Sequence, residues 1–339
     1  MKQLFKKLLL FFPVVGVTLL SCTENKVNKK NITKENIQEL SIKELDSLIR
    51  KNPFNDTLFY KRAKLKLAQK KIDDAINDFN LALKIDSNKA EYYLELSRLY
   101  ILKAKSEESL KLLKIAIKKF NDNYKIFNEL GKLYFLVKEY NKAHKIFDKA
   151  IDIYPYNADA YYFKAMSYLE TNDTSKAKFY FNRSVEADPN FYNAYIMLGA
   201  IALSQKDTLA KQYFKTAIRI DSSSVEAHYS LGYYYQTVEQ NYPNAIKEYE
   251  YILNNLDSTF SNAYFNIGYL ILFYTNHYKE SIPYFKKAYA YSPTNVDALV
   301  NIGLAYKFIN KKDSAKFYFL KALEISPNYE RAIKEINSL

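Results

Sequence analysis

Apolar and polar positions alternate along most of this chain with the period of an α-helix. Between about Asp56 and Tyr329 the apolar residues recur at steps of three and four, which places them on one face of a helix. Prolines follow several of these segments, namely Pro155, Pro189, Pro293 and Pro327. Because proline cannot continue a helix, we interpret them as stops. The pattern predicts a series of consecutive amphipathic helices.

Small residues also recur at an interval of about 34. Gly131 and Gly199 are 68 residues apart, which is twice 34. Numbered as position eight of each copy, the column reads Ala63, Ser97, Gly131, Ala165, Gly199, Gly232, Gly268 and Gly303. A fixed period of this length is the signature of a solenoid.

Three further columns keep the same register. Position twenty is Ala or Ser from Ala75 to Ala315, and position twenty-seven is small in every copy except that of Ile252. Position twenty-four is large, and reads Phe79, Leu113, Phe147, Phe181, Phe214, Tyr249, Phe285 and Phe319. We infer that two helices of each copy touch at the small residues, with the large side chain in the seam between them.

The clearest copy contains Phe127, Leu130, Gly131, Tyr134, Tyr140, Ala143, Phe147, Ala150 and Pro155. This pattern resembles the tetratricopeptide repeat, a unit of 34 residues. The resemblance implies an all-α fold, a right-handed superhelical solenoid of antiparallel helix pairs. The chain departs from the family in having no Trp, and small insertions are expected around Tyr242–Pro243 and Asn276–His277. Pro283 is expected to kink or delay a second helix.

The register divides the chain as follows: signal peptide 1–21, tether 22–36, N-terminal capping half-repeat 37–55, C-terminal capping helix 330–339, and eight units at 56–89, 90–123, 124–157, 158–191, 192–224, 225–260, 261–295 and 296–329. Solenoid ends need a polar outer face, and both predicted caps provide one.

The first residues indicate export. Lysines precede a thirteen-residue, nearly all-apolar run at 8–20, which is short for a spanning helix and typical of a signal peptide. The run ends Leu19-Leu20-Ser21-Cys22, which resembles the bacterial lipobox. The resemblance implies a lipid on Cys22, the only cysteine of the chain. The alternative is an uncleaved hydrophobic anchor followed by a chance cysteine, and both readings place the body outside the cytoplasm.

Thr23 after the cysteine implies, by the lipoprotein sorting rule, the outer membrane facing the periplasm, with display at the cell surface as the alternative. The segment that follows the cysteine is too polar to fold and is predicted to be a flexible tether. The chain carries a net charge of +13, but export argues against nucleic acid as a partner. We interpret the excess as a solvated lysine surface.

No motif of catalysis or of metal or cofactor binding is found. His144, His228 and His277 are far apart in sequence. The sequence therefore predicts a protein that is not an enzyme and needs no cofactor or metal.

The remaining expectation is binding of other proteins or peptides. The family's first helices line a concave groove, where positions two, five, nine, twelve and thirteen face the ligand. In this chain those positions predict a basic row at Lys64, Arg98, Lys125 and Lys132, followed by an apolar and aromatic portion at Tyr162, Met166, Tyr229, Tyr233, Phe265, Tyr269 and Phe273. The alternative interpretation is that these aromatic residues pack between helices and the cations are solvated.

Two functions remain open at this point. The first is a lipid-anchored scaffold of the cell envelope, and the second is a receptor for an anionic or aromatic non-protein ligand such as a glycan or cell-wall fragment.

Overall fold

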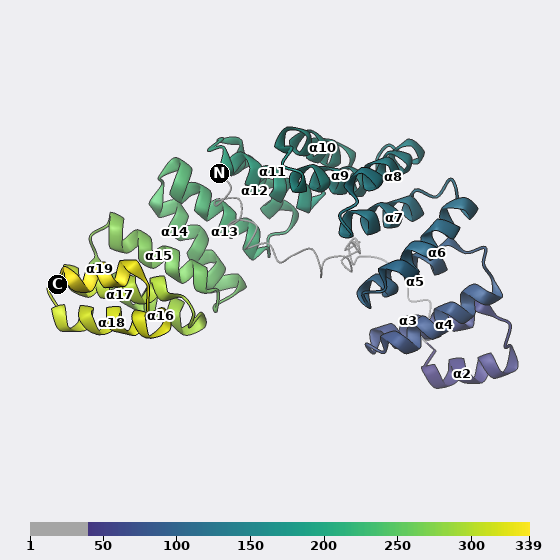
Figure 1. Cartoon of the computed structure of the whole chain (residues 1–339), viewed down its shortest axis with the longest axis horizontal. Helices are drawn as coiled ribbons and strands as arrows, with labels where there is room; N and C mark the ends of the chain where they lie inside the picture. Colours follow the sequence, from purple (N-terminus) through teal and green to yellow (C-terminus); the bar gives the residue numbers. More distant parts are fainter. Residues whose placement is uncertain (1–39) are drawn as a thin grey trace, which may run out of the picture. The chain divides into compact units, whose positions relative to one another are not determined.

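The structure is a computed structural model that describes residues 40–339. The predicted signal peptide, Cys22 and the tether lie outside the described residues. The described range contains 18 α-helices and no strand, which confirms the all-α prediction. It forms two bodies, an N-terminal body that ends at Phe191 and a C-terminal body of 192–339. Each body by itself is a stack of helix pairs (Figure 1).

The first helices of the pairs are α3 (Asp56–Ala68), α5 (Ala90–Leu102), α7 (Tyr124–Leu136), α9 (Ala158–Glu170), α11 (Tyr192–Ser204), α13 (Val225–Tyr234), α15 (Ser261–Tyr274) and α17 (Val296–Phe308). The second helices are α4 (Ile72–Ile85), α6 (Ser106–Lys119), α8 (Tyr140–Ile153), α10 (Thr174–Ala187), α12 (Leu209–Ile220), α14 (Tyr242–Tyr251), α16 (Tyr278–Tyr291) and α18 (Lys312–Ile325). Helices α2 (Ile42–Lys51) and α19 (Glu330–Asn337) stand before and after them.

The core of each pair is the seam that the sequence predicts. All eight residues at position twenty-four have no exposed surface, and the same holds at positions twenty and twenty-seven. Where both small residues are serines, they satisfy each other: Ser97 and Ser109 share a hydrogen bond of 2.8 Å between their hydroxyls. The copy with these serines also has Leu113 instead of an aromatic residue. A larger residue on the first helix, Ser97 in place of glycine, is thus accompanied by a smaller one on the second helix.

The glycines mark the closest approach of the paired helices. None of the five in the described range has a positive φ. A Cβ added to Gly131, Gly199 or Gly303 would lie within 3.0 Å of the ring at position twenty-four of the same copy. At Gly268 the nearest ring atoms of Phe285 would be 3.1 Å away. The glycines are therefore needed for close packing and not for turns.

The turns between paired helices use a left-handed residue that is never glycine. The eight positive-φ residues of the described range, with φ between 53° and 63°, are Lys70, Ala104, Lys138, Asn172, Lys206, Gln240, Asn276 and Asn310. Each follows a first helix. After α5, Ala104 donates its N–H to Ile101 O at 2.9 Å and Lys105 donates to Tyr100 O at 2.7 Å. This is the hydrogen-bond pattern of a Schellman motif, in which glycine is the usual left-handed residue.

Prolines and insertions are accommodated at helix ends, with one exception. Pro155 lies two residues beyond the end of α8, as predicted. The sixth copy contains a π-helical turn after α13 (Tyr235–Glu239), shortly before the predicted insertion around Tyr242–Pro243, and a second one after α14 (Ile252–Leu256). The expected delay at Pro283 is wrong, because α16 begins at Tyr278 and continues through that proline, whereas the expected kink stays a prediction.

We expect Gly199→Ala to lower the free energy of unfolding by about 1–3 kcal/mol, because the new methyl group overpacks against Phe214. Gly268→Ala is the matched control and should cost less, since Phe285 lies farther from the added carbon. Urea denaturation of the two variants measures both values. An equal or larger loss for Gly268→Ala would contradict the seam geometry.

We expect Ala104→Gly to stabilise the protein by about 1 kcal/mol, because the left-handed conformation is costly for a residue with a Cβ. Ala290→Gly, at an exposed position inside α16, should have the opposite sign. Thermal unfolding of both variants provides the comparison, and a lower melting temperature for Ala104→Gly would refute the assignment.

Candidate functional site

The predicted groove residues all lie on first helices. In the N-terminal body, Lys64 is on α3, Arg98 on α5, Lys125 and Lys132 on α7, and Tyr162 and Met166 on α9. In the C-terminal body, Tyr229 and Tyr233 are on α13, and Phe265, Tyr269 and Phe273 are on α15. The two sets therefore lie in separate units of the chain.

The cations at position nine are engaged by acids on the next first helix. Lys64 Nζ lies 3.2 Å from Glu95 Oε1, and Arg98 Nη2 lies 2.8 Å from Glu129 Oε1. These pairs join residues 31 apart, so each links neighbouring copies. The three predicted cations at this position are therefore not a row of free charges.

Lys132 completes the series of ion pairs. It forms an ion pair with Asp159 on α9 and lies 4.0 Å from Glu129 Oε1. Burial would lower the pKa of Lys132, but the charges of Asp159 and Glu129 outweigh it and raise the pKa above its ordinary value. The fourth predicted cation, Lys125, is exposed. The first helices of the N-terminal body are thus linked by ion pairs in which positive and negative side chains alternate. The sequence interpretation missed these ion pairs.

The two apolar candidates of this body are mostly packed. Met166 is buried. Tyr162 is partly buried, with its ring 5.5 Å from that of Phe181 and 5.4 Å from that of Phe191. Here the alternative interpretation of the sequence, packing between helices, describes what these side chains do. Their part in ligand binding stays a prediction.

The C-terminal body has a different surface. We call Tyr229, Tyr233, Phe265, Tyr269 and Phe273 the aromatic wall. The rings of Tyr229 and Tyr233 are 6.5 Å apart and stacked, and those of Tyr269 and Phe273 are 4.7 Å apart. All five side chains are partly exposed, and Phe273 retains 36% of its surface. The wall therefore offers apolar area to a ligand.

The helix α15 carries no charged residue, and α13 carries only Glu226 and His228. The polar groups on the aromatic wall and next to it are tyrosine hydroxyls and side-chain amides instead. Asn266 Nδ2 donates to the hydroxyl of Tyr229 at 3.2 Å, and burial raises the pKa of Tyr229 to about 12. This surface suits an uncharged partner, because rings contribute apolar contact while hydroxyls stay hydrated.

One buried amide beside the wall lacks a partner. Asn301 on α17 has no exposed surface. Its Oδ1 accepts from Arg331 Nη2 at 2.8 Å, but in the described part of the chain its Nδ2 has no hydrogen-bond partner. Asn301 stands at position six, as Asn266 does in the preceding copy. The residue that corresponds to Tyr229 is then Phe265, which has no hydroxyl.

Other titratable groups do not gather into a site. The ring of His144 lies 4.3 Å from that of Tyr168, and burial and the charge of Lys164 lower the pKa of His144. His228 Nδ1 lies 2.8 Å from Glu248 Oε2. Among the described residues, no group of three His, Cys, Asp or Glu side chains could hold a metal ion. Within residues 40–339, every helix is too short or too polar to span a bilayer.

Comparison with known proteins identifies the repeats. A tetratricopeptide repeat family model matches residues 134–207, and a second one matches 261–295 and 296–329. The chain therefore contains tetratricopeptide repeats, as the spacing predicts. Both matched models describe this repeat. No curated protein sequence matches the chain.

Solved structures share the fold. The Cut9–Hcn1 structure of the APC/C is 15% identical with a TM-score of 0.51 over 87% of this chain. The chain covers 58% of that protein's length. The pilF protein of Pseudomonas aeruginosa is 15% identical (TM-score 0.51, 58% of this chain and 90% of that one). Human IFIT1 is 14% identical (TM-score 0.51, 84% and 67%). At these identities the likeness concerns the fold alone.

We expect Phe265→Tyr to raise the free energy of unfolding by about 1 kcal/mol, because its hydroxyl would accept from Asn301 Nδ2. As a control, Phe285→Tyr buries a hydroxyl in a seam and should destabilise the protein. Urea denaturation measures both. A neutral or destabilising Phe265→Tyr would contradict the proposed equivalence of Asn266 and Asn301.

Proposed function

We propose that this protein is a lipid-anchored adaptor of the bacterial cell envelope that binds partner proteins or peptides on its first helices. The observation that carries the proposal is the aromatic wall. It combines partly exposed rings with an absence of charge on α15, and within residues 40–339 no ion pair of α15 has to be broken for a partner to reach it. Tetratricopeptide repeats generally serve as non-catalytic scaffolds, which fits this role.

The character of the partner follows from the surface. A neutral, aromatic or aliphatic segment would gain contact area at the rings of Tyr233, Tyr269 and Phe273. Tyrosine loses little side-chain entropy on binding, which suits it to such contacts. An acidic segment of a partner that bound to the N-terminal body would have to compete with Glu95, Glu129 and Asp159 for the cations that these acids already pair with. We therefore place the main contact with a partner in the C-terminal body.

A second candidate function is a receptor for a glycan or cell-wall fragment. The partly exposed tyrosines of the aromatic wall, such as Tyr233 and Tyr269, favour it, since sugar hydroxyls bond to phenol hydroxyls while apolar sugar faces stack on rings. The paired cations of the N-terminal body give less support to an anionic ligand than to an uncharged one.

Photocrosslinking tests the proposed function as an adaptor. We expect a photoreactive phenylalanine analogue at Tyr233 to give protein adducts in intact cells, because the wall would face the partner. The same analogue at Phe317, which is 59% exposed on the second helix α18, should give none of these adducts.

Combined Tyr233→Ala, Tyr269→Ala and Phe273→Ala should remove the partner from pull-downs while leaving the helical content unchanged. Adducts that carry glycan and no protein would instead support the receptor. Identical adducts from both positions would contradict the assignment of the site.

We expect Cys22→Ser to move the protein from the membrane fraction to the soluble fraction, because the thioether that would hold the lipid cannot form. Incorporation of a clickable palmitate analogue should be lost in the same variant. A Cys22→Ser protein that stays in the membrane fraction would support the uncleaved hydrophobic anchor.

A further inference from the structure

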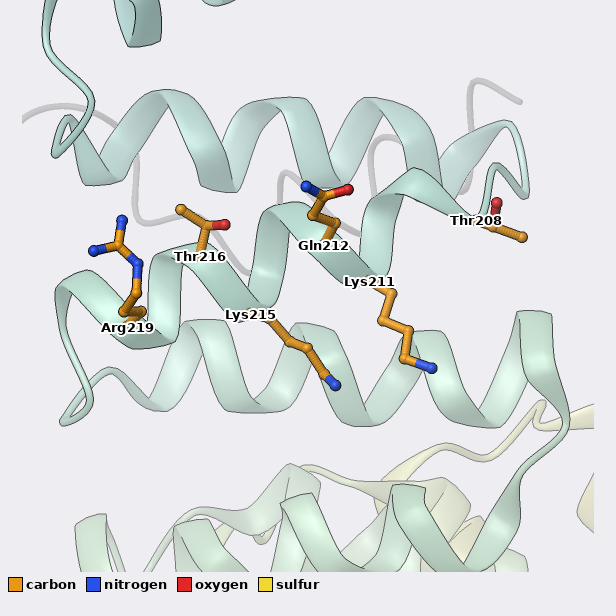
Figure 2. Close-up of a pocket in the computed structure, with 6 residues that line it drawn as sticks. All are labelled: Thr208, Lys211, Gln212, Lys215, Thr216 and Arg219. Carbon is orange, nitrogen blue, oxygen red and sulfur yellow. The ribbon is translucent and has the colours of Figure 1, made fainter.

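The second helix α12 has a basic face and no acidic residue of its own. Lys211, Lys215 and Arg219 follow one another at four-residue steps, which places them along one side of the helix about 6 Å apart. Thr208, Gln212 and Thr216 form a parallel row, and the two rows line a hollow on the surface (Figure 2). We call these six residues the α12 face.

No acid within α12 balances these cations. Every other described helix that contains Lys or Arg also contains Asp or Glu, but the sequence of α12 from Leu209 to Ile220 has none. Like charges four residues apart destabilise a helix. The three cations therefore repel one another along the helix, and α12 contains no acid that relieves this repulsion.

Neighbouring elements neutralise only one end of the row. Lys211 Nζ lies 2.9 Å from Glu239 Oε1 and 5.3 Å from the ring centre of Tyr235. Lys215 and Arg219 are exposed, and neither forms an ion pair within residues 40–339.

The acids that flank α12 are already committed to turns. Asp207 Oδ1 accepts the N–H of Leu209 at 2.9 Å, and Asp221 Oδ1 accepts that of Ser223 at 3.0 Å. The cations of Lys215 and Arg219, with the hydroxyl of Thr216 and the amide of Gln212 beside them, are thus available to bind a group from outside the chain.

We propose that the α12 face docks an acidic helical segment of a partner protein, with carboxylates at four-residue spacing. The charges of the two helices would match in spacing, because carboxylates at every fourth residue of the partner helix repeat at about 6 Å, as the cations of α12 do. Gln212 and Thr216 add hydrogen-bond donors beside the cations. The face lies on a second helix, whereas the aromatic wall lies on first helices. An adaptor with both surfaces holds two partners at once, and the α12 face does not depend on the wall.

Fluorescence anisotropy with a labelled helical peptide that has glutamate at every fourth position tests this proposal on the full-length protein in detergent. We expect Lys215→Glu with Arg219→Glu to weaken binding by about tenfold or more, since two exposed charge pairs are lost and replaced by repulsion. Added salt should weaken binding to the wild type in parallel.

Lys279→Glu with Lys286→Glu on α16 is the matched control. Both lysines are exposed on a second helix of the same body, and the change in net charge is the same, so the affinity should stay within about twofold of wild type. The triple alanine variant of the aromatic wall should also bind the peptide normally, which separates this test from that of the proposed groove.

Three outcomes would overturn the proposal. The first is equal weakening by the α16 control, which would show attraction by net charge alone. The second is undiminished binding by the α12 variant. The third is binding of phosphatidylglycerol vesicles through Lys215 and Arg219 with no binding of the peptide, which would assign the face to a membrane surface.

Discussion

The contact between a small residue on each first helix and a large residue on its partner is the constraint on which this structure depends. At Gly199 the backbone of α11 lies so close to the ring of Phe214 that a single added carbon would overlap it. Because protein interiors are close-packed, such a seam fixes the separation of the paired helices. The Ser97, Ser109 and Leu113 combination shows the same constraint met by other side chains, with a hydrogen bond between the serines and a smaller residue in the seam.

The seam does not restrict the residues on the other faces of each helix, and these residues differ between the two bodies. In the N-terminal body the first helices are linked by ion pairs such as Arg98 with Glu129. In the C-terminal body position nine of α13 and α15 carries Tyr233 and Tyr269, and Asn266 of α15 donates a hydrogen bond to the hydroxyl of Tyr229 on α13. Ion pairs thus link the first helices α3, α5, α7 and α9, while α15 presents rings and hydroxyls and carries no charged residue. The cations of α12 lie outside this arrangement, on a second helix.

The sequence predicts the helix pairs and their seams because both depend on residue volume at a fixed spacing, which repeats eight times. It does not predict the left-handed turns, since Lys70 and Ala104 are poor indicators of positive φ, although Asn172, Asn276 and Asn310 in the same column are suggestive. The ion pairs were missed for a different reason. The partner of a cation at position nine lies in the next copy, as Glu95 lies 31 residues after Lys64, so the pattern within one copy does not show the pair. The missing partner of Asn301 requires atomic contacts and has no sequence signal.

A double-mutant cycle between Gly199→Ala and Phe214→Leu tests the central constraint most directly. If the overlap of the new methyl group with the ring causes the loss of stability, the smaller leucine relieves it, as Leu113 accompanies Ser97 in the second copy. The account predicts that the double variant is more stable than the sum of the two single losses by about 1 kcal/mol or more in urea denaturation. Strictly additive losses would contradict it, because they would mean that the two positions do not touch.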